Sequence, residues 1–170
     1  MLDLQWRKRA LVGLALAFFF DAQAATTDQI DAARINGVKL LLLRQKGDGS
    51  WGDGAGKIPA TTSVLEALRR AGVLGFPYTQ GIAWLANAEA QNTDYLARQI
   101  ITLQSVGMDT SKLVSRLIAL RNDTTLSWGS YNHFNGSFPD TSLALDAIKA
   151  TNAFYASTGN GLGFITAKQN

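Results

Sequence analysis

The sequence predicts an all-α protein built from an array of helical hairpins. Apolar residues recur at helical spacing through most of the chain, and the stretches between them are rich in glycine. No segment shows the strict alternation of a half-buried strand. One pattern of glycine, apolar and amide positions also returns several times, as expected for a solenoid or toroid.

Seven helices are expected, each separated from the next by turn-forming residues. The first runs from about Asp28 to Gln45, because apolar residues recur there at helical spacing and Gly47 follows as a turn residue. The second starts between Pro59 and Ser63, with Ser63 and Glu66 spaced as a capping box, and it ends at Gly72. The other helices are expected over about Thr79 to Ala90, Thr93 to Val106, Ser111 to Arg121, Asp140 to Phe154 and Gly161 to Asn170.

Residues 1–24 have the pattern of a secretory signal peptide. A basic group at residues 7–9 precedes an apolar run from Ala10 to Phe20, and Ala22-Gln23-Ala24 supplies small residues at a cleavage site. Eleven apolar residues are short of the roughly 20 that a transmembrane helix needs, which favours cleavage after Ala24 over an uncleaved membrane anchor. We therefore expect an exported protein, periplasmic or extracellular, with residues 25–170 forming one domain without a stable membrane span.

Charge and composition exclude several classes of site. Removing residues 1–24 takes away three basic and two acidic residues, so the formal charge falls from +3 to +2. No basic cluster with interleaved aromatic residues remains, so a nucleic-acid partner is not expected. The absence of cysteine excludes disulfides, thiolate metal sites and a cysteine nucleophile.

The most informative stretch joins the first two predicted helices. Gly37, Leu41, Gln45, Gly49 and Trp51 follow one another at a spacing that resembles the QW motif of terpene cyclases and of the wider prenyltransferase and squalene-cyclase repeat family. The resemblance implies that the glutamine amide stacks on the tryptophan indole and ties two helix ends together. The alternative is a glycine-punctuated hairpin loop in which the tryptophan only covers the edge of the core.

Further copies of the pattern favour the repeat interpretation. Their starts, residues 37, 81, 114 and 161, are separated by 44, 33 and 47 residues, which suits one helical hairpin each. Residues 62–71 also align without a gap on residues 141–150. The copies consist of Gly81, Trp84, Leu85 and Glu89; of Gly161, Phe164, Ile165 and Gln169; and of the degenerate set Val114, Leu117, Ile118, Asn122 and Trp128.

The family resemblance implies an α/α toroid, with the helices before each QW loop outside and those after it lining a central cavity. The chain holds about three and a half hairpins, so we expect an incomplete ring. It stops at Gln169-Asn170, where the next loop would begin, and this suggests a piece of a longer protein.

The acidic cluster of the catalytic relatives is largely missing. Squalene cyclases and class II diterpene cyclases use a D-x-D-D-T motif, and the matching segment here keeps one aspartate, Asp140. Asp140 is therefore a weak catalytic candidate, and capping a helix that begins at Thr141 is the simpler role. The zinc site of protein prenyltransferases needs a cysteine and a histidine, whereas this chain has only His133, in a polar loop, so neither a metal nor another cofactor is expected.

Two other motif matches fail on spacing. Residues 48–53 look like a calcium loop, but position twelve is Pro59 where an EF-hand needs glutamate. Gly159 to Gly163 looks like a nucleotide-binding loop, but it follows a helix where such a loop follows a strand.

Two functions remain open. The sequence favours an exported, non-catalytic module that binds an unidentified ligand or protein partner. The alternative is a fragment of a terpene cyclase-like or prenyltransferase-like enzyme whose catalytic acids lie outside this chain. The resemblance places a ligand at the N-terminal ends of the inner helices, near Thr61, Thr62, Asp140 and Thr141, with Trp51, Trp128, Tyr131 and Phe138 flanking them as packing residues.

Overall fold

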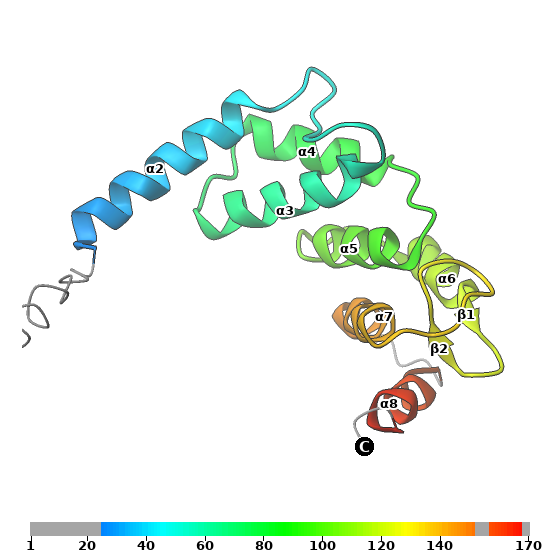
Figure 1. Ribbon diagram of the computed structural model, residues 1–170. Helices are drawn as coiled ribbons and strands as arrows, with labels where there is room; N and C mark the ends of the chain where they lie inside the picture. Colours follow the sequence, from blue (N-terminus) through cyan, green and yellow to red (C-terminus); the bar gives the residue numbers. More distant parts are fainter. Residues whose placement is uncertain (1–24, 152–156, 168–170) are drawn as a thin grey trace, which may run out of the picture. The chain divides into compact units, whose positions relative to one another are not determined.

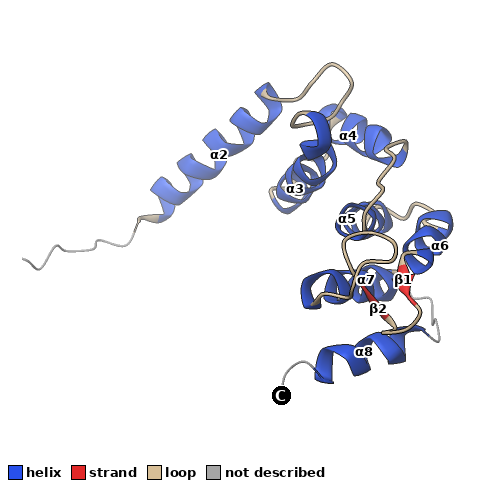
Figure 2. Ribbon diagram, turned by 45° about the vertical axis from the view of Figure 1, so that its right-hand side comes forward, coloured by secondary structure: helices blue, strands red, loops and turns tan. Residues whose placement is uncertain are grey.

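The computed structural model describes residues 25–151 and 157–167. The predicted signal peptide, residues 1–24, lies outside the described residues, as do Gln169 and Asn170. The described part is all-α, as predicted, with one short pair of strands (Figures 1 and 2). Its elements are α2 (Thr27–Leu43), η2 (Gly54–Gly56), α3 (Lys57–Arg70), α4 (Phe76–Ala86), α5 (Thr93–Gln104), α6 (Ser111–Ala119), β1 (Arg121–Asn122), β2 (Ser127–Trp128), α7 (Phe138–Ala150) and α8 (Ser157–Ala167).

Helix α2 runs across the boundary between two compact units, which meet between Asn36 and Gly37. Its start is a capping box, because the Gln29 amide N–H donates to Thr26 Oγ1 and the Thr26 amide N–H donates to Gln29 Oε1. The helix therefore begins at Thr27, one residue before the predicted start. Among the described residues, no helix is both long and apolar enough to cross a membrane.

Four other predicted helix starts are too late. Helix α4 begins at Phe76, before the predicted Thr79, and α8 begins at Ser157, before the predicted Gly161. Helix α3 begins at Lys57, so Ser63 and Glu66 lie inside the helix and form no capping box. Helix α7 begins at Phe138 with Ser137 as its N-cap, so Asp140 is the third helical residue and does not cap a helix starting at Thr141. In α7 a proline in the first turn marks the true start, because proline fits a position that needs no amide hydrogen.

The helices of the second unit pack in two rows. Helix α5 lies between α3 and α7, and these three form one row. Helices α4, α6 and α8 form the second row. Helix α4 packs on α3 and α5, α6 packs on α5 and α7, and α8 packs on α7, so each of them covers part of the first row.

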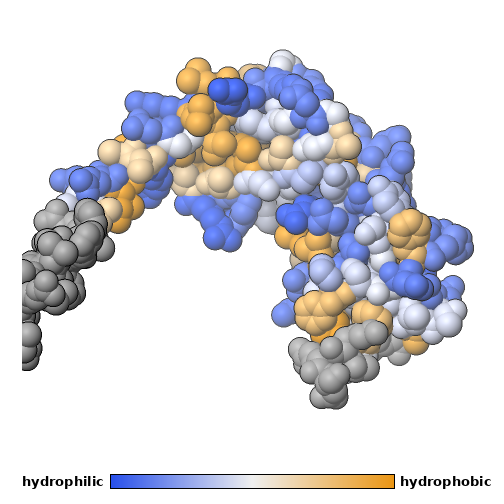
Figure 3. Space-filling model, in the orientation of Figure 1, coloured by the Kyte–Doolittle hydropathy of each residue, from blue (hydrophilic) through white to orange (hydrophobic). Residues whose placement is uncertain are grey.

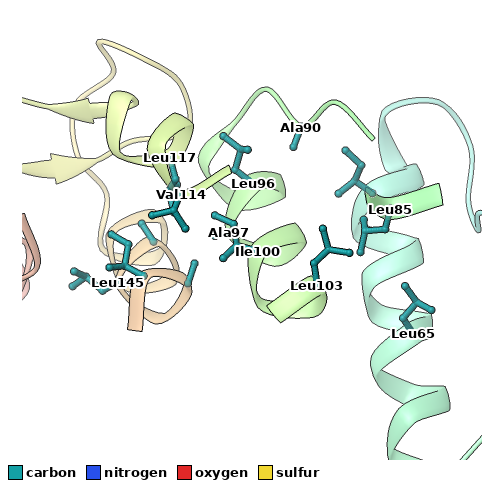
Figure 4. Packing of buried hydrophobic residues seen from close by; sticks show 14 of the residues in the cluster. Leu65, Leu85, Ala90, Leu96, Ala97, Ile100, Leu103, Val114, Leu117 and Leu145 are labelled. Atoms are coloured by element: carbon teal, nitrogen blue, oxygen red, sulfur yellow. The ribbon is translucent and has the colours of Figure 1, made fainter. Parts of the chain in front are cut away.

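Aliphatic side chains of α5 occupy the centre of the core. Figure 4 shows Ala97, Ile100 and Leu103 between Val114 and Leu117 on one side and Leu65 and Leu85 on the other. All seven are at most 2% exposed. Burying a side chain of this kind contributes about 1.5–3 kcal/mol, so this cluster supplies much of the stability of the unit. Patches of exposed hydrophobic residues still interrupt the polar surface in Figure 3.

A small hairpin that the sequence did not predict joins α6 to α7. Strand β1 pairs antiparallel with β2, with Arg121 opposite Trp128. Asn122 closes the turn, because its Oδ1 accepts hydrogen bonds from the amides of Thr124 and Thr125. Strands of two residues are too short to show a period of two, so no alternation could reveal them.

Candidate functional site

Trp51 is fixed by three hydrogen bonds. Its amide N–H donates to Thr61 Oγ1 at 2.9 Å, and the Thr61 hydroxyl donates to the Trp51 carbonyl at 3.3 Å. Its indole Nε1 donates to the Leu41 carbonyl at 2.7 Å. Both the Trp51 ring and Thr61 are buried. The loop after α2 is therefore attached to α2 through the indole and to α3 through the threonine.

Trp128 has the same set of bonds. Its amide N–H donates to Thr141 Oγ1 at 3.1 Å, and the Thr141 hydroxyl donates to the Trp128 carbonyl at 3.2 Å. Its Nε1 donates to the Leu117 carbonyl at 2.7 Å. We call these two sets of contacts the tryptophan ties: Trp51 with Leu41 and Thr61, and Trp128 with Leu117 and Thr141.

Each tryptophan ring also lies against a glycine of a following helix. A Cβ added to Gly81 would come 2.7 Å from Cζ3 of Trp51, and one added to Gly161 would come 3.2 Å from Cζ3 of Trp128. The same added atoms would approach Leu65 Cδ2 at 2.9 Å and Leu145 Cδ2 at 3.0 Å. A side chain on Gly81 would therefore force a neighbour to shift, and one on Gly161 would make unusually tight contacts.

The ties correct the alignment of α3 with α7. Thr61 corresponds to Thr141, and Leu65 corresponds to Leu145. The alignment that pairs residues 62–71 with 141–150 must therefore be shifted by one residue. In the corrected register Glu66 and Asp146 coincide, and each is followed by alanine. Thr62 is thus not the counterpart of Thr141.

The Gln45 amide makes two hydrogen bonds that dock its loop. Nε2 donates to the Gly49 carbonyl at 2.9 Å and to the Pro77 carbonyl, in the first turn of α4, at 2.7 Å. Gly49 lies close to α4 as well, because it has φ +89° and an added Cβ would come 2.7 Å from the Gln80 carbonyl oxygen. Gln45 thus links the loop to α4 by hydrogen bonds.

Helices α4 and α5, which lie between the two tryptophan ties in the sequence, use other residues for the same contacts. The Leu85 carbonyl accepts a hydrogen bond from the buried Gln99 amide at 2.7 Å, where Leu41 and Leu117 accept from an indole. The loop after α4 contains no tryptophan. Gly81 stands four residues before Leu85, and the residue four before Leu117 in α6 is the partly buried Leu113. An amide and a larger aliphatic side chain therefore replace the tryptophan and the glycine.

Three of the four residues expected to face a ligand bond to a loop next to their helix, whereas Thr62 bonds only to Pro59 of its own helix. Thr61 and Thr141 are fully buried against the tryptophan backbones. Asp140 Oδ2 accepts hydrogen bonds from Ser137 Oγ at 2.6 Å and Ser130 Oγ at 3.2 Å, while the Asp140 amide donates to Ser137 Oγ. The carboxylate therefore closes the first turn of α7.

The fourth residue, Thr62, lies on an open groove formed by α3, α5 and α7. This inner-face groove has a volume of about 430 Å³ and is lined by four hydroxyl side chains, three charged ones and two aliphatic ones: Thr62, Ser63, Glu66, Arg69, Arg98, Ile101, Thr102, Ser105 and Leu143. Hydrogen bonds from Arg69, and then from Arg70, lower the pKa of Glu66 to about 2. Arg98 pairs with Asp94 at 2.8 Å.

A second recess has a different lining, and we call it the aromatic cleft. It has a volume of about 350 Å³ and collects three aromatic side chains from separate segments: Trp84 of α4, Tyr95 of α5 and Tyr131 of the loop before α7. Lys57, Glu89, Gln91 and Asn92 add polar groups. Sequence analysis named Trp84 as part of a repeat copy and Tyr131 as a packing residue. No spacing in the sequence predicts that residues 84, 95 and 131 lie around one recess.

His133 lies in an exposed loop and has φ +67°, an uncommon backbone conformation for a residue other than glycine. Among the residues that the structure describes, no three or more histidine, aspartate or glutamate side chains gather as they would around a metal ion.

No family model, curated protein or solved structure matches this chain.

Proposed function

We propose that this protein is an exported, non-catalytic module with an α/α toroid-type array of hairpins, which binds a ligand or a protein partner. The two tryptophan ties support the array, because the same residue types make the same bonds in two places. The alternation of two helix rows also fits hairpins in which one helix faces outward and the next faces inward.

The hydrogen bonds of Asp140 carry the non-catalytic part of the proposal. A general acid needs its carboxyl group free to reach a substrate, whereas Asp140 Oδ2 is engaged by Ser130 and Ser137. The nearby Thr141 is buried in the second tie. The residues at the start of α7 therefore have structural partners.

The inner-face groove supports the binding part. The groove lies on α3, α5 and α7, the second helix of each hairpin. Repeat arrays commonly use one such face for recognition. Its hydroxyl and arginine side chains offer hydrogen-bond donors to a ligand, and Ile101 and Leu143 provide apolar surface. Thr62 is the predicted ligand-facing residue that lies in this groove.

Incubation with isoprenoids tests whether this chain itself is catalytic. The purified chain is mixed with squalene and with geranylgeranyl diphosphate, and the products are analysed by mass spectrometry. We expect neither compound to be converted. A cyclised product that disappears in Asp140→Asn, but persists in the matched control Asp146→Asn on the exposed side of α7, would overturn the proposal.

Export is tested separately. The full chain, expressed in a bacterial host, should be recovered outside the cytoplasm with a mass that corresponds to a start at Ala25. A protein that keeps residues 1–24 and stays with the cytoplasmic fraction contradicts this part of the proposal.

A further inference from the structure

The aromatic cleft has the size and lining of a small-ligand site. Its volume of about 350 Å³ lies within the range of about 300–1,000 Å³ that is usual for such sites. Trp84 and Tyr95 are partly buried, and Tyr131 is 48% exposed, so aromatic surface is open to solvent inside the recess. None of the residues lining the cleft also lines the inner-face groove.

Contacts outside the cleft hold its aromatic side chains in place. The loop that carries Tyr131 is fixed to the start of α5, because the Thr93 hydroxyl donates to the Gly129 carbonyl at 2.6 Å and the Thr93 amide donates to the Ser130 carbonyl at 3.0 Å. The Tyr131 ring packs edge-on against Phe134, with 5.6 Å between the ring centroids. A ligand would therefore meet a site that is already formed.

Asn92 and Lys57 position the other two rings. Asn92 Oδ1 accepts a hydrogen bond from the Tyr95 amide at 2.8 Å and so fixes the first turn of α5. The Lys57 ammonium lies 5.8 Å from the centroid of the Trp84 ring and is paired with Asp48 at 2.7 Å. The cation–π contact and the ion pair together limit the movement of the lysine.

The charges of the cleft disfavour an ionic ligand. The positive charge of Lys57 is already balanced by Asp48, so an anion gains little there and meets the Glu89 carboxylate. A cation would meet the Lys57 ammonium over the Trp84 ring. A neutral ligand avoids both costs.

Several polar groups remain available for such a ligand. Within the described part of the chain, the side chains of Glu89 and Gln91 make no hydrogen bond or ion pair, and the hydroxyls of Tyr95 and Tyr131 make none either. These groups include both donors and acceptors. Aromatic faces beside unpaired donors and acceptors match the chemistry of a sugar ring, which has an apolar C–H face and hydroxyls around its edge.

We propose that the aromatic cleft binds a neutral saccharide, with a pyranose ring stacked on the aromatic side chains and its hydroxyls bonded to Glu89 and Gln91. This inference rests on the proposed binding function and names a ligand class for it. The two can fail separately, because turnover of an isoprenoid would refute the non-catalytic module without affecting saccharide binding.

Tryptophan fluorescence provides the test, because Trp51 and Trp128 are buried and Trp84 lines the cleft. The full chain carrying Trp6→Phe, which removes the fourth tryptophan, is titrated with linear oligosaccharides of glucose, of N-acetylglucosamine and of mannose. We expect a saturable change in emission with at least one of them. The proposal is overturned if none produces a saturable change, or if tetramethylammonium or inorganic phosphate competes with the sugar at the same site.

Variants locate the binding, with calorimetry as the readout. Tyr131→Ala should weaken binding about two- to ten-fold, through the loss of one stacked aromatic contact. Gln91→Ala, in an exposed loop position that folding does not depend on, should weaken it about three-fold through one lost hydrogen bond. Phe76→Ala, an exposed aromatic outside the cleft, and Ser63→Ala in the inner-face groove are the controls and should bind as the parent does. Unchanged affinity in both Tyr131→Ala and Gln91→Ala refutes the site.

Discussion

The Trp51 ring occupies the space that a side chain on Gly81 would need, with Cζ3 2.7 Å from the position of an added Cβ. The same relationship holds between Trp128 and Gly161 at 3.2 Å. The loop between α4 and α5 has no tryptophan, and the α6 residue in the glycine's place, four before Leu117, is Leu113. A glycine thus stands opposite each loop that has a tryptophan, and a larger aliphatic residue stands opposite the loop that has none.

Substituting Gly81 with alanine should destabilise the protein. The added methyl group would contact both Trp51 and Leu65 at less than 3 Å, and both side chains are buried, so a shift of either would disturb its packed neighbours. Overpacking of this kind costs about 1–3 kcal/mol. The free energy of unfolding in urea measures the loss.

Gly163→Ala is the matched control for this substitution. Gly163 also lies in a helix, but nothing lies within 4 Å of its added Cβ, so the change should be neutral or stabilising by up to about 1 kcal/mol. Combining Gly81→Ala with Trp51→Leu should cost less than the sum of the two single changes. Strict additivity would show that the ring and the glycine do not share one space.

Removal of the Thr61 or Thr141 hydroxyl should weaken the corresponding tryptophan tie. In Thr61→Val or Thr141→Val, a buried amide N–H and carbonyl lose their partner, which costs about 1–3 kcal/mol for each variant. Chemical denaturation measures both. Thr62→Val is the control, because the Thr62 hydroxyl donates only to the Pro59 carbonyl within its own helix. An equal loss in Thr62→Val would contradict the register in which Thr61 matches Thr141.

Asp140→Ala should lower stability without any effect on the tryptophan ties. The substitution removes an acceptor of two serine hydroxyls and a negative charge from the first turn of α7, together about 1 kcal/mol. Thermal unfolding should show a lower midpoint. Asp146→Ala, in the exposed middle of the same helix, should leave the midpoint nearly unchanged, and an equal drop in both variants would argue against the local role of Asp140.

Protonation of Glu66 should lower the stability of the folded protein in acid. Its pKa is lowered from 4.5 to about 2 in the folded state, with the hydrogen bond from Arg69 as the largest cause. Between these values the unfolded chain binds more protons, so the contribution of Glu66 is present above about pH 4.5 and is lost as the pH falls toward 2. The side chain is 40% exposed, so solvent screening limits the effect to about 0.2–1 kcal/mol.

Denaturation curves measured through this pH window check the Glu66 prediction. Glu66→Gln should show a flatter decline of stability with falling pH than the parent. Added salt should reduce the difference between the two, because it screens the arginine pairs. The same slope in both proteins would mean that the carboxylate makes no pH-dependent contribution.

The sequence predicted the helices well where apolar spacing was strong, as in α5, which begins at Thr93 as expected. It predicted α3 and α7 too late, because Ser63 and Asp140 have side chains that suit a cap, whereas the actual N-caps precede prolines in the first turn. Choosing between such candidates needs the backbone geometry of the preceding loop.

The candidate sites were less accessible from sequence. Thr61 and Thr141 were expected at the helix starts, but whether such a hydroxyl faces solvent or a tryptophan backbone depends on how the loop folds over the helix. The aromatic cleft joins Trp84 with Tyr131 across two helices and a loop. Packing of α4 on α5 and the hydrogen bonds of Thr93 to the Tyr131 loop bring these segments together.

The matched sizes of Trp51, Gly81 and Leu113 also limit how the hairpins can be recombined by deletion or duplication. If α4 and α5 were excised so that α6 followed α3, the Trp51 ring would meet Leu113 in the space that glycine leaves free. Excising α4 to α7, so that α8 followed α3, would instead bring the ring against Gly161, which leaves that space open. A protein that lacks α4 to α7 should therefore keep the packing between the Trp51 ring and the following helix. A protein that lacks only α4 and α5 should lose it.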